Sequence, residues 1–130
     1  PAWGLGQCLN AGDALNAIAY RALVAGNADA GRRLRSSMIV TRAFVEDIER
    51  RNGAVLWAGL EAGAVLGGAS ERLARRLRRA GRLLAAAAAS PVRAPHYAAR
   101  AIAAVERSGI ESGYAQRFAE VAAYVGSQAA

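Results

Sequence analysis

The 130-residue sequence predicts an all-α fold, most simply a helical bundle. Three observations support this class. Apolar residues recur at three- and four-residue spacing along most of the chain, no stretch alternates apolar and polar residues long enough for a strand, and Gly, Pro and Ser interrupt the pattern at short intervals. Because 54% of the residues are hydrophobic, a chain of this length can bury one core, and we expect a single helical domain over residues 1–130.

The first two helices are expected before Asn52-Gly53, which interrupts the helical pattern. Apolar residues between Leu5 and Val24 predict a first helix, and Gly26-Asn27 ends it. A second helix is expected to begin near Asp29, with an apolar stripe on one side and charged residues facing water on the other. The stripe consists of Leu34, Met38, Val45 and Ile48, and the charged residues are Arg32, Arg35, Arg42, Glu46 and Glu49.

The most apolar stretch, residues 54–66, predicts a third helix that ends at Gly67-Gly68. It is shorter than the roughly 20 residues of a membrane span and carries Glu61 near its middle, so we interpret it as a core helix. Gly59, Gly63 and Gly67 share one face of this helix. We expect a neighbouring helix to pack closely there, and a self-association seam is the alternative.

Ser70 is predicted to be the N-cap of a fourth helix, with Glu71 in its first turn. Six arginines between Arg72 and Arg82 surround a leucine stripe, which we interpret as a solvated outer face, with nucleic-acid or anionic-membrane binding as the alternative. Ser90-Pro91 ends this helix, and Pro95 is expected to act as a second breaker. Two more helices are expected around residues 97–105 and 118–125.

The chain carries a formal net charge of +7, and all 17 of its basic residues are arginines. Arginine binds phosphate and carboxylate as a planar fork, which is consistent with a phosphorylated ligand. Cys8 is the only cysteine, so an internal disulfide is excluded and a reducing compartment is favoured. No secretory signal is recognisable, and we expect a cytoplasmic protein. The chain begins at Pro1, as a processed or partial version of a longer protein would.

Few residues predict catalysis or metal binding. Glu46, Asp47 and Glu49 lie among arginines, and we interpret them as a solvated, salt-bridged surface. His96 has no second histidine or cysteine at ligand spacing, which argues against zinc. A Cys8–His96 catalytic pair is disfavoured against a small thiol and a loop histidine. No catalytic residue is therefore assigned.

The segment Asn10-Ala-Gly-Asp-Ala-Leu15, preceded by Trp3-Gly-Leu-Gly-Gln7, resembles the trans-isoprenyl diphosphate synthase family, also called polyprenyl synthetases. The resemblance continues over nearly the whole chain, at residues 51–56, 60–69, 77–89 and 97–125. It implies part of the isoprenoid synthase fold and a homodimer to which the first helices contribute. It also implies a prenyltransferase of isoprenoid biosynthesis, which condenses an allylic diphosphate with isopentenyl diphosphate.

The resemblance also implies Mg²⁺, which the family holds with two aspartate-rich motifs. Neither motif occurs here: the first would precede Pro1, and the second would follow Ala89, where Ser90-Pro91 stands. Mg²⁺ is therefore an implied cofactor without visible ligands. The chain is either a partial view of a synthase or a non-catalytic helical partner of one, and a basic nucleic-acid-binding domain is a third hypothesis. The sequence makes no strong case for nucleic acid or membrane.

By the same resemblance, Arg51 stands where the family has a lysine that contacts the substrate diphosphate, and Asn52 stands at the neighbouring threonine. Arginine keeps the positive charge, and asparagine keeps hydrogen-bonding ability. Arg51 and Asn52 are thus the predicted diphosphate-binding residues. The alternative interpretation of this pair is an exposed helix end.

Overall fold

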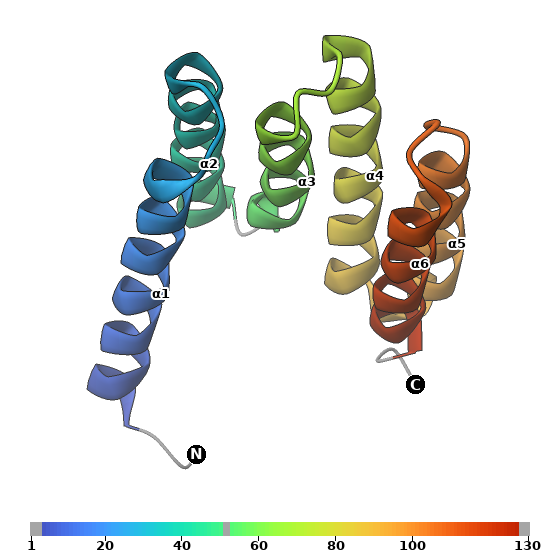
Figure 1. The fold of residues 1–130 in the computed structure, drawn as a ribbon. Helices are drawn as coiled ribbons and strands as arrows, with labels where there is room; N and C mark the ends of the chain where they lie inside the picture. The colour runs from blue at the N-terminus through green and yellow to red at the C-terminus, as the bar shows by residue number, and fades with distance from the viewer. Residues whose placement is uncertain (1–3, 51–52, 128–130) are drawn as a thin grey trace.

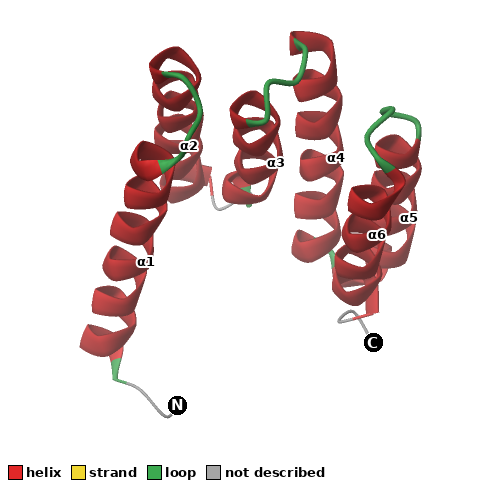
Figure 2. Cartoon of the chain, in the orientation of Figure 1, coloured by secondary structure: helices red, strands yellow, loops and turns green. Residues whose placement is uncertain are grey.

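Helices make up the fold of the computed structural model, which describes residues 4–50 and 53–127 (Figure 1). Figure 2 shows helices joined by loops, with no strand in the described residues, and the predicted all-α class is confirmed. None of the helices in these two ranges is both long and apolar enough to cross a membrane. The elements are α1 (Leu5–Ala25), α2 (Ala30–Arg50), α3 (Ala54–Leu66), α4 (Glu71–Ala89), the 3₁₀ turn η1 (Pro91–Arg93), α5 (Ala94–Glu106) and α6 (Ser112–Ser127).

Side-chain caps and breakers set several of these helix ends, as the sequence predicts. Ser70 accepts a hydrogen bond from the backbone N–H of Leu73 at the start of α4, at 3.3 Å. Asp29 accepts the N–H of Arg32 at 3.0 Å before α2. The expectation that Pro95 breaks the chain is wrong. Pro95 lies in the first turn of α5, where the missing N–H of proline leaves no helical hydrogen bond unmade.

The helices form an up-and-down array in which each packs mainly against its neighbours in the chain (Figure 1). The pairs α2–α3, α3–α4, α4–α5 and α5–α6 make the extensive contacts, and α6 also reaches α4. By comparison, α1 makes only a small contact with α2. The α3–α4 pair therefore stands in the middle of the array, covered by α2 on one side and by α5 and α6 on the other.

Small side chains dominate the core between these helices. Alanines are the commonest buried residues, and Trp57 of α3, 2% exposed, is the largest fully buried side chain. The helices α3 and α4 approach each other closely at Gly81 of α4, which is itself buried. A Cβ added there would come within 2.4 Å of the Cα of Trp57. Backbone therefore meets backbone between α3 and α4.

The close packing predicted for the glycine face of α3 is wrong. Gly59 and Gly63 are exposed, and a Cβ added at either would meet no atom within 4 Å. The neighbouring helix α4 instead packs on the opposite face, which carries Trp57 and the buried Glu61. The glycine that allows close approach is on α4, since Gly81 presents no side chain to α3.

The apolar stripe predicted for α2 is not the face that packs in this chain. Leu34, Met38 and Val45 are at least half exposed. The residues that α2 buries against α3 are Ser36, Ile39 and Ala43. Ser36 donates a hydrogen bond to the carbonyl of Ala62 at 3.2 Å, so a small polar residue fits between the two helices. The helix is apolar on two faces, and α3 selects the one with smaller side chains.

Candidate functional site

The predicted diphosphate-binding residues, Arg51 and Asn52, lie outside the described residues, in the junction between α2 and α3. Both sides of the junction are held in place. Asp47 on α2 accepts a hydrogen bond from the backbone N–H of Ala54 at 2.9 Å, which ties the end of one helix to the start of the next. Gly53 adopts a left-handed conformation with φ 67° and lies against Ala85 of α4. The junction is therefore anchored to α4 as well.

Three arginines surround the indole of Trp57, about one helical turn beyond this junction. The guanidinium carbons of Arg42, Arg78 and Arg82 lie 5.5, 4.5 and 5.7 Å from the ring centroid. Arg42 comes from α2, and the other two lie one turn apart on α4. Cations this close to an indole are attracted by its π electrons. We call Trp57 with these three arginines the Trp57 arginine cluster.

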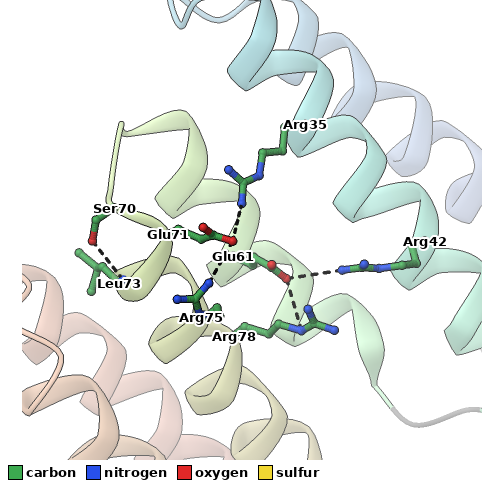
Figure 3. A network of polar contacts seen from close by, with 8 residues as sticks. All are labelled: Arg35, Arg42, Glu61, Ser70, Glu71, Leu73, Arg75 and Arg78. Carbon is green, nitrogen blue, oxygen red and sulfur yellow. Dashed lines mark hydrogen bonds and ion pairs between the residues drawn. The ribbon is translucent and has the colours of Figure 1, made fainter.

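Glu61 is the carboxylate that the structure places beside this cluster (Figure 3). Its Oε2 atom lies 3.5 Å from Nε of Arg78 and 3.9 Å from Nη2 of Arg42. Glu61 is 7% exposed, and neither its Oε2 nor the Nε of Arg78 makes a hydrogen bond among the described residues. The contacts are therefore charge–charge contacts without good hydrogen-bond geometry. Two guanidinium groups share this buried carboxylate, and Arg82 adds a third positive charge beside Trp57, which leaves an excess of positive charge in the cluster.

A second polar group, near the start of α4, is exposed to solvent (Figure 3). Glu71 pairs with Arg75 at 3.0 Å on its own helix and with Arg35 of α2 at 3.9 Å. The side chains of all three are more than half exposed. This part of α4 is the solvated outer face that the sequence predicts. Arg78 differs, because its side chain turns toward Glu61 and is only 27% exposed.

The Trp57 arginine cluster was not predicted from the sequence, although the sequence carries a signal for it. Trp57 and Glu61 are four residues apart on α3, and Arg78 and Arg82 are four apart on α4. Residues at that spacing share a helix face. An aromatic and an acid on one face, and two arginines on a face of the next helix, form a complementary pattern. This pattern predicts the cluster only when the contact between the two helices at Gly81 is known, because that contact sets which faces meet.

The described residues do not offer a Mg²⁺ site. Among the residues whose side chains the structure describes, which leaves out Cys8 and Glu49, no group of three or more His, Cys, Asp or Glu could hold a metal ion. The Asp47 carboxylate is engaged by the N–H of Ala54, and Glu61 faces arginines. We therefore derive no reaction step through magnesium. His96 is exposed in the first turn of α5 with its ring 5.7 Å from that of Tyr97, and the side chain of Cys8 lies outside the described part.

Searches for related proteins return nothing: no family model, no curated protein and no solved structure matches this chain. The resemblance to trans-isoprenyl diphosphate synthases is therefore a hypothesis that depends on the sequence segments alone.

Proposed function

We propose that this chain is a helical domain that binds isoprenoid diphosphates, of the kind that serves prenyltransferases joining an allylic diphosphate to isopentenyl diphosphate. The observation that supports this best is the position of the Trp57 arginine cluster. Trp57 is four residues beyond Gly53, about 6 Å along the axis of α3. Arg42, Arg78 and Arg82 thus lie near the start of α3, which Arg51 and Asn52 precede in the sequence.

The chemistry of the cluster suits a diphosphate. Guanidinium groups donate paired hydrogen bonds to phosphate oxygens, and the excess positive charge beside Glu61 favours an anion. In the condensation, the carbon–oxygen bond of the allylic diphosphate breaks and the diphosphate leaves with the electron pair. Arginines that hold the leaving diphosphate stabilise the negative charge it acquires. We assign binding and leaving-group stabilisation to this chain, and expect no turnover by the chain alone.

The test uses Trp57 as the reporter. The chain has two tryptophans, so a Trp3→Phe background leaves Trp57 as the one emitter. Titration with pyrophosphate and with geranyl diphosphate should change its fluorescence saturably, because an anion withdraws guanidinium groups from the indole. Arg82→Gln should weaken binding about tenfold, in line with the loss of a charge-assisted hydrogen bond. Arg72→Gln, an exposed arginine of the same helix outside the cluster, is the matched control.

Two outcomes would contradict the proposal. The first is an unchanged Trp57 emission with both ligands, and the second is equal weakening by Arg82→Gln and Arg72→Gln. A separate incubation of the chain with geranyl diphosphate, isopentenyl diphosphate and Mg²⁺ tests the division of labour. An elongated prenyl diphosphate would show that the chain is catalytic on its own, against our assignment.

A second candidate function is a non-catalytic helical partner, either in a homodimer or beside an active synthase. It is favoured by large apolar side chains on α1 and α2 that are at least half exposed in this chain. They are Leu15, Ile18, Val24, Leu34, Met38 and Val45. Light scattering behind size exclusion should give twice the mass of 13.5 kDa for a homodimer. Met38→Glu should reduce the measured mass to that of one chain. A parent protein that is already monomeric would contradict the homodimer hypothesis.

A further inference from the structure

An open groove of about 690 Å³ lies between α4 and α5, away from the Trp57 arginine cluster. Its floor is apolar, made by Leu83 and three alanines of α5. The other lining residues are four arginines and one histidine, and no carboxylate is among them. They are Arg76 and Arg79 of α4, His96 and Arg100 of α5, and Arg107, which directly follows α5.

These four arginines lack the carboxylate partners that other arginines of the chain have. Among the described residues, Arg75 pairs with Glu71 and Arg78 faces Glu61, but no ion pair involves the groove arginines. Arg76 alone of the four has hydrogen-bond partners there, the carbonyl oxygens of Arg107 and Ser108 at 3.5 and 3.4 Å. These carbonyls belong to the negative end of α5, so Arg76 is partly compensated.

A second groove shows what a balanced surface looks like. It has a volume of about 310 Å³ and is lined by parts of α2, α3 and α4. Its two arginines, Arg32 and Arg35, meet two carboxylates that also line it, Asp29 and Glu71. Packing of α4 on α5 instead gathers like charges with no acid between them. Because such charges repel one another, an anion from outside the chain would relieve the repulsion.

The shape and lining of the groove indicate what kind of anion fits. His96 lies in the first turn of α5 and Arg107 is the residue after its last, eleven positions further on, so the basic residues extend over about 16 Å. A linear anion with several charged groups matches this length better than a single phosphate does. No Phe, Tyr or Trp side chain lines the groove and His96 is the one ring in its lining, so bases of a single-stranded nucleic acid would find little surface to stack on.

We propose that the α4–α5 groove is a binding site for a linear oligophosphate, either free or as the phosphate tail of a small organic molecule. Arg79 and Arg100 would hold the phosphates directly, since neither has a polar partner among the described residues. This site is separate from the Trp57 arginine cluster and does not depend on prenyl chemistry.

Isothermal titration of the whole chain with sodium tripolyphosphate at low salt tests the proposal. The double variant Arg79→Gln/Arg100→Gln should weaken binding at least tenfold. The control Arg72→Gln/Arg117→Gln also removes two positive charges, but from exposed positions outside the groove, and it should change affinity less than twofold. Circular dichroism of both variants verifies that each keeps its helices. No measurable binding, or equal weakening by the two double variants, would overturn the proposal.

Two further titrations identify the source of the ligand. Similar affinities for tripolyphosphate and adenosine triphosphate would support a site that contacts the phosphate chain alone. Tighter binding of the nucleotide would support a ligand whose organic part also contacts the groove. A single-stranded DNA of about 20 nucleotides provides the third comparison. If the chain binds this DNA more tightly than tripolyphosphate, and Arg79→Gln/Arg100→Gln abolishes DNA binding, the small-ligand proposal is overturned in favour of nucleic acid. Arg82→Gln should leave tripolyphosphate binding intact, which separates this site from the proposed diphosphate function.

Discussion

Replacement of Gly81 by alanine tests the close backbone contact between α3 and α4. The added Cβ would lie 2.4 Å from the Cα of Trp57 and 3.0 Å from the carbonyl oxygen of Leu56. Ordinary contact begins at 3.4 Å, so α3 and α4 would have to separate locally by the difference of about 1 Å. Neither backbone atom can rotate away. Such overpacking costs about 1–3 kcal/mol, and we expect the upper end here.

Two opposing terms determine the net effect of Gly81→Ala. Alanine favours a helix interior over glycine by about 1 kcal/mol, which offsets part of the clash. We expect a net loss of about 2 kcal/mol. Gly63→Ala makes the same chemical change at an exposed position of α3, where the new Cβ meets no atom within 4 Å. It should therefore stabilise the chain by up to about 1 kcal/mol.

Urea unfolding followed by circular dichroism of the helices measures the free energy of unfolding of both variants. In a thermal scan, each 1 kcal/mol corresponds to a shift of roughly 3–5 °C in melting temperature. Opposite signs for Gly81→Ala and Gly63→Ala are the expected result. A Gly81→Ala chain as stable as the parent would refute direct backbone contact between α3 and α4. Destabilisation by Gly63→Ala together with a fall in oligomeric mass would instead support the self-association seam on the glycine face.

Three further substitutions test individual polar contacts. Glu61→Gln should lower the free energy of unfolding by about 1–3 kcal/mol, because Arg78 loses its buried counter-charge, yet pyrophosphate binding seen by Trp57 fluorescence should tighten; weaker binding would contradict the proposed site. Asp47→Ala should cost about 1 kcal/mol in urea unfolding by removing the acceptor for the N–H of Ala54, and Asp47→Asn should recover part of it. The pKa of Asp29 lies below its usual value mainly because its carboxylate accepts a backbone N–H, so the ionised form contributes stability above about pH 4 that is lost as the pH falls through the lowered pKa. Asp29→Asn should therefore flatten the acid side of a plot of melting temperature against pH, and an unchanged slope would count against this contribution.

Helix ends were predictable from sequence because they depend on local chemistry. Gly67-Gly68 ends α3, Ser70 caps α4, and Ser90-Pro91 follows α4, each as predicted from one or two residues. A cap needs only a hydroxyl or carboxylate near free N–H groups, and a stop needs only a residue that cannot continue the helix. Neighbouring helices have little influence on such choices.

The packed faces were harder to predict because they depend on residues far away in the chain. Along α2, Leu34 and Met38 look like core residues, but α3 takes the side with Ile39 and Ala43. Along α4, six arginines have the same local character, and only the position of Glu61 on α3 distinguishes Arg78 from the others. Which arginines face a buried acid and which face α5 therefore follows from helix register, which a single sequence does not contain.

The up-and-down order of the helices has a consequence for how the chain opens. Because each helix contacts mainly its immediate neighbours, few interactions join helices that are not consecutive in the chain, and such topologies fold quickly. Energetic coupling then runs along a line, so that loosening one end disturbs only the next helix. Amide protons of α1, which makes only a small contact with α2, should exchange with solvent long before those of α3 and α4. The free energy of local opening thus rises from the N-terminal helix toward the middle of the array.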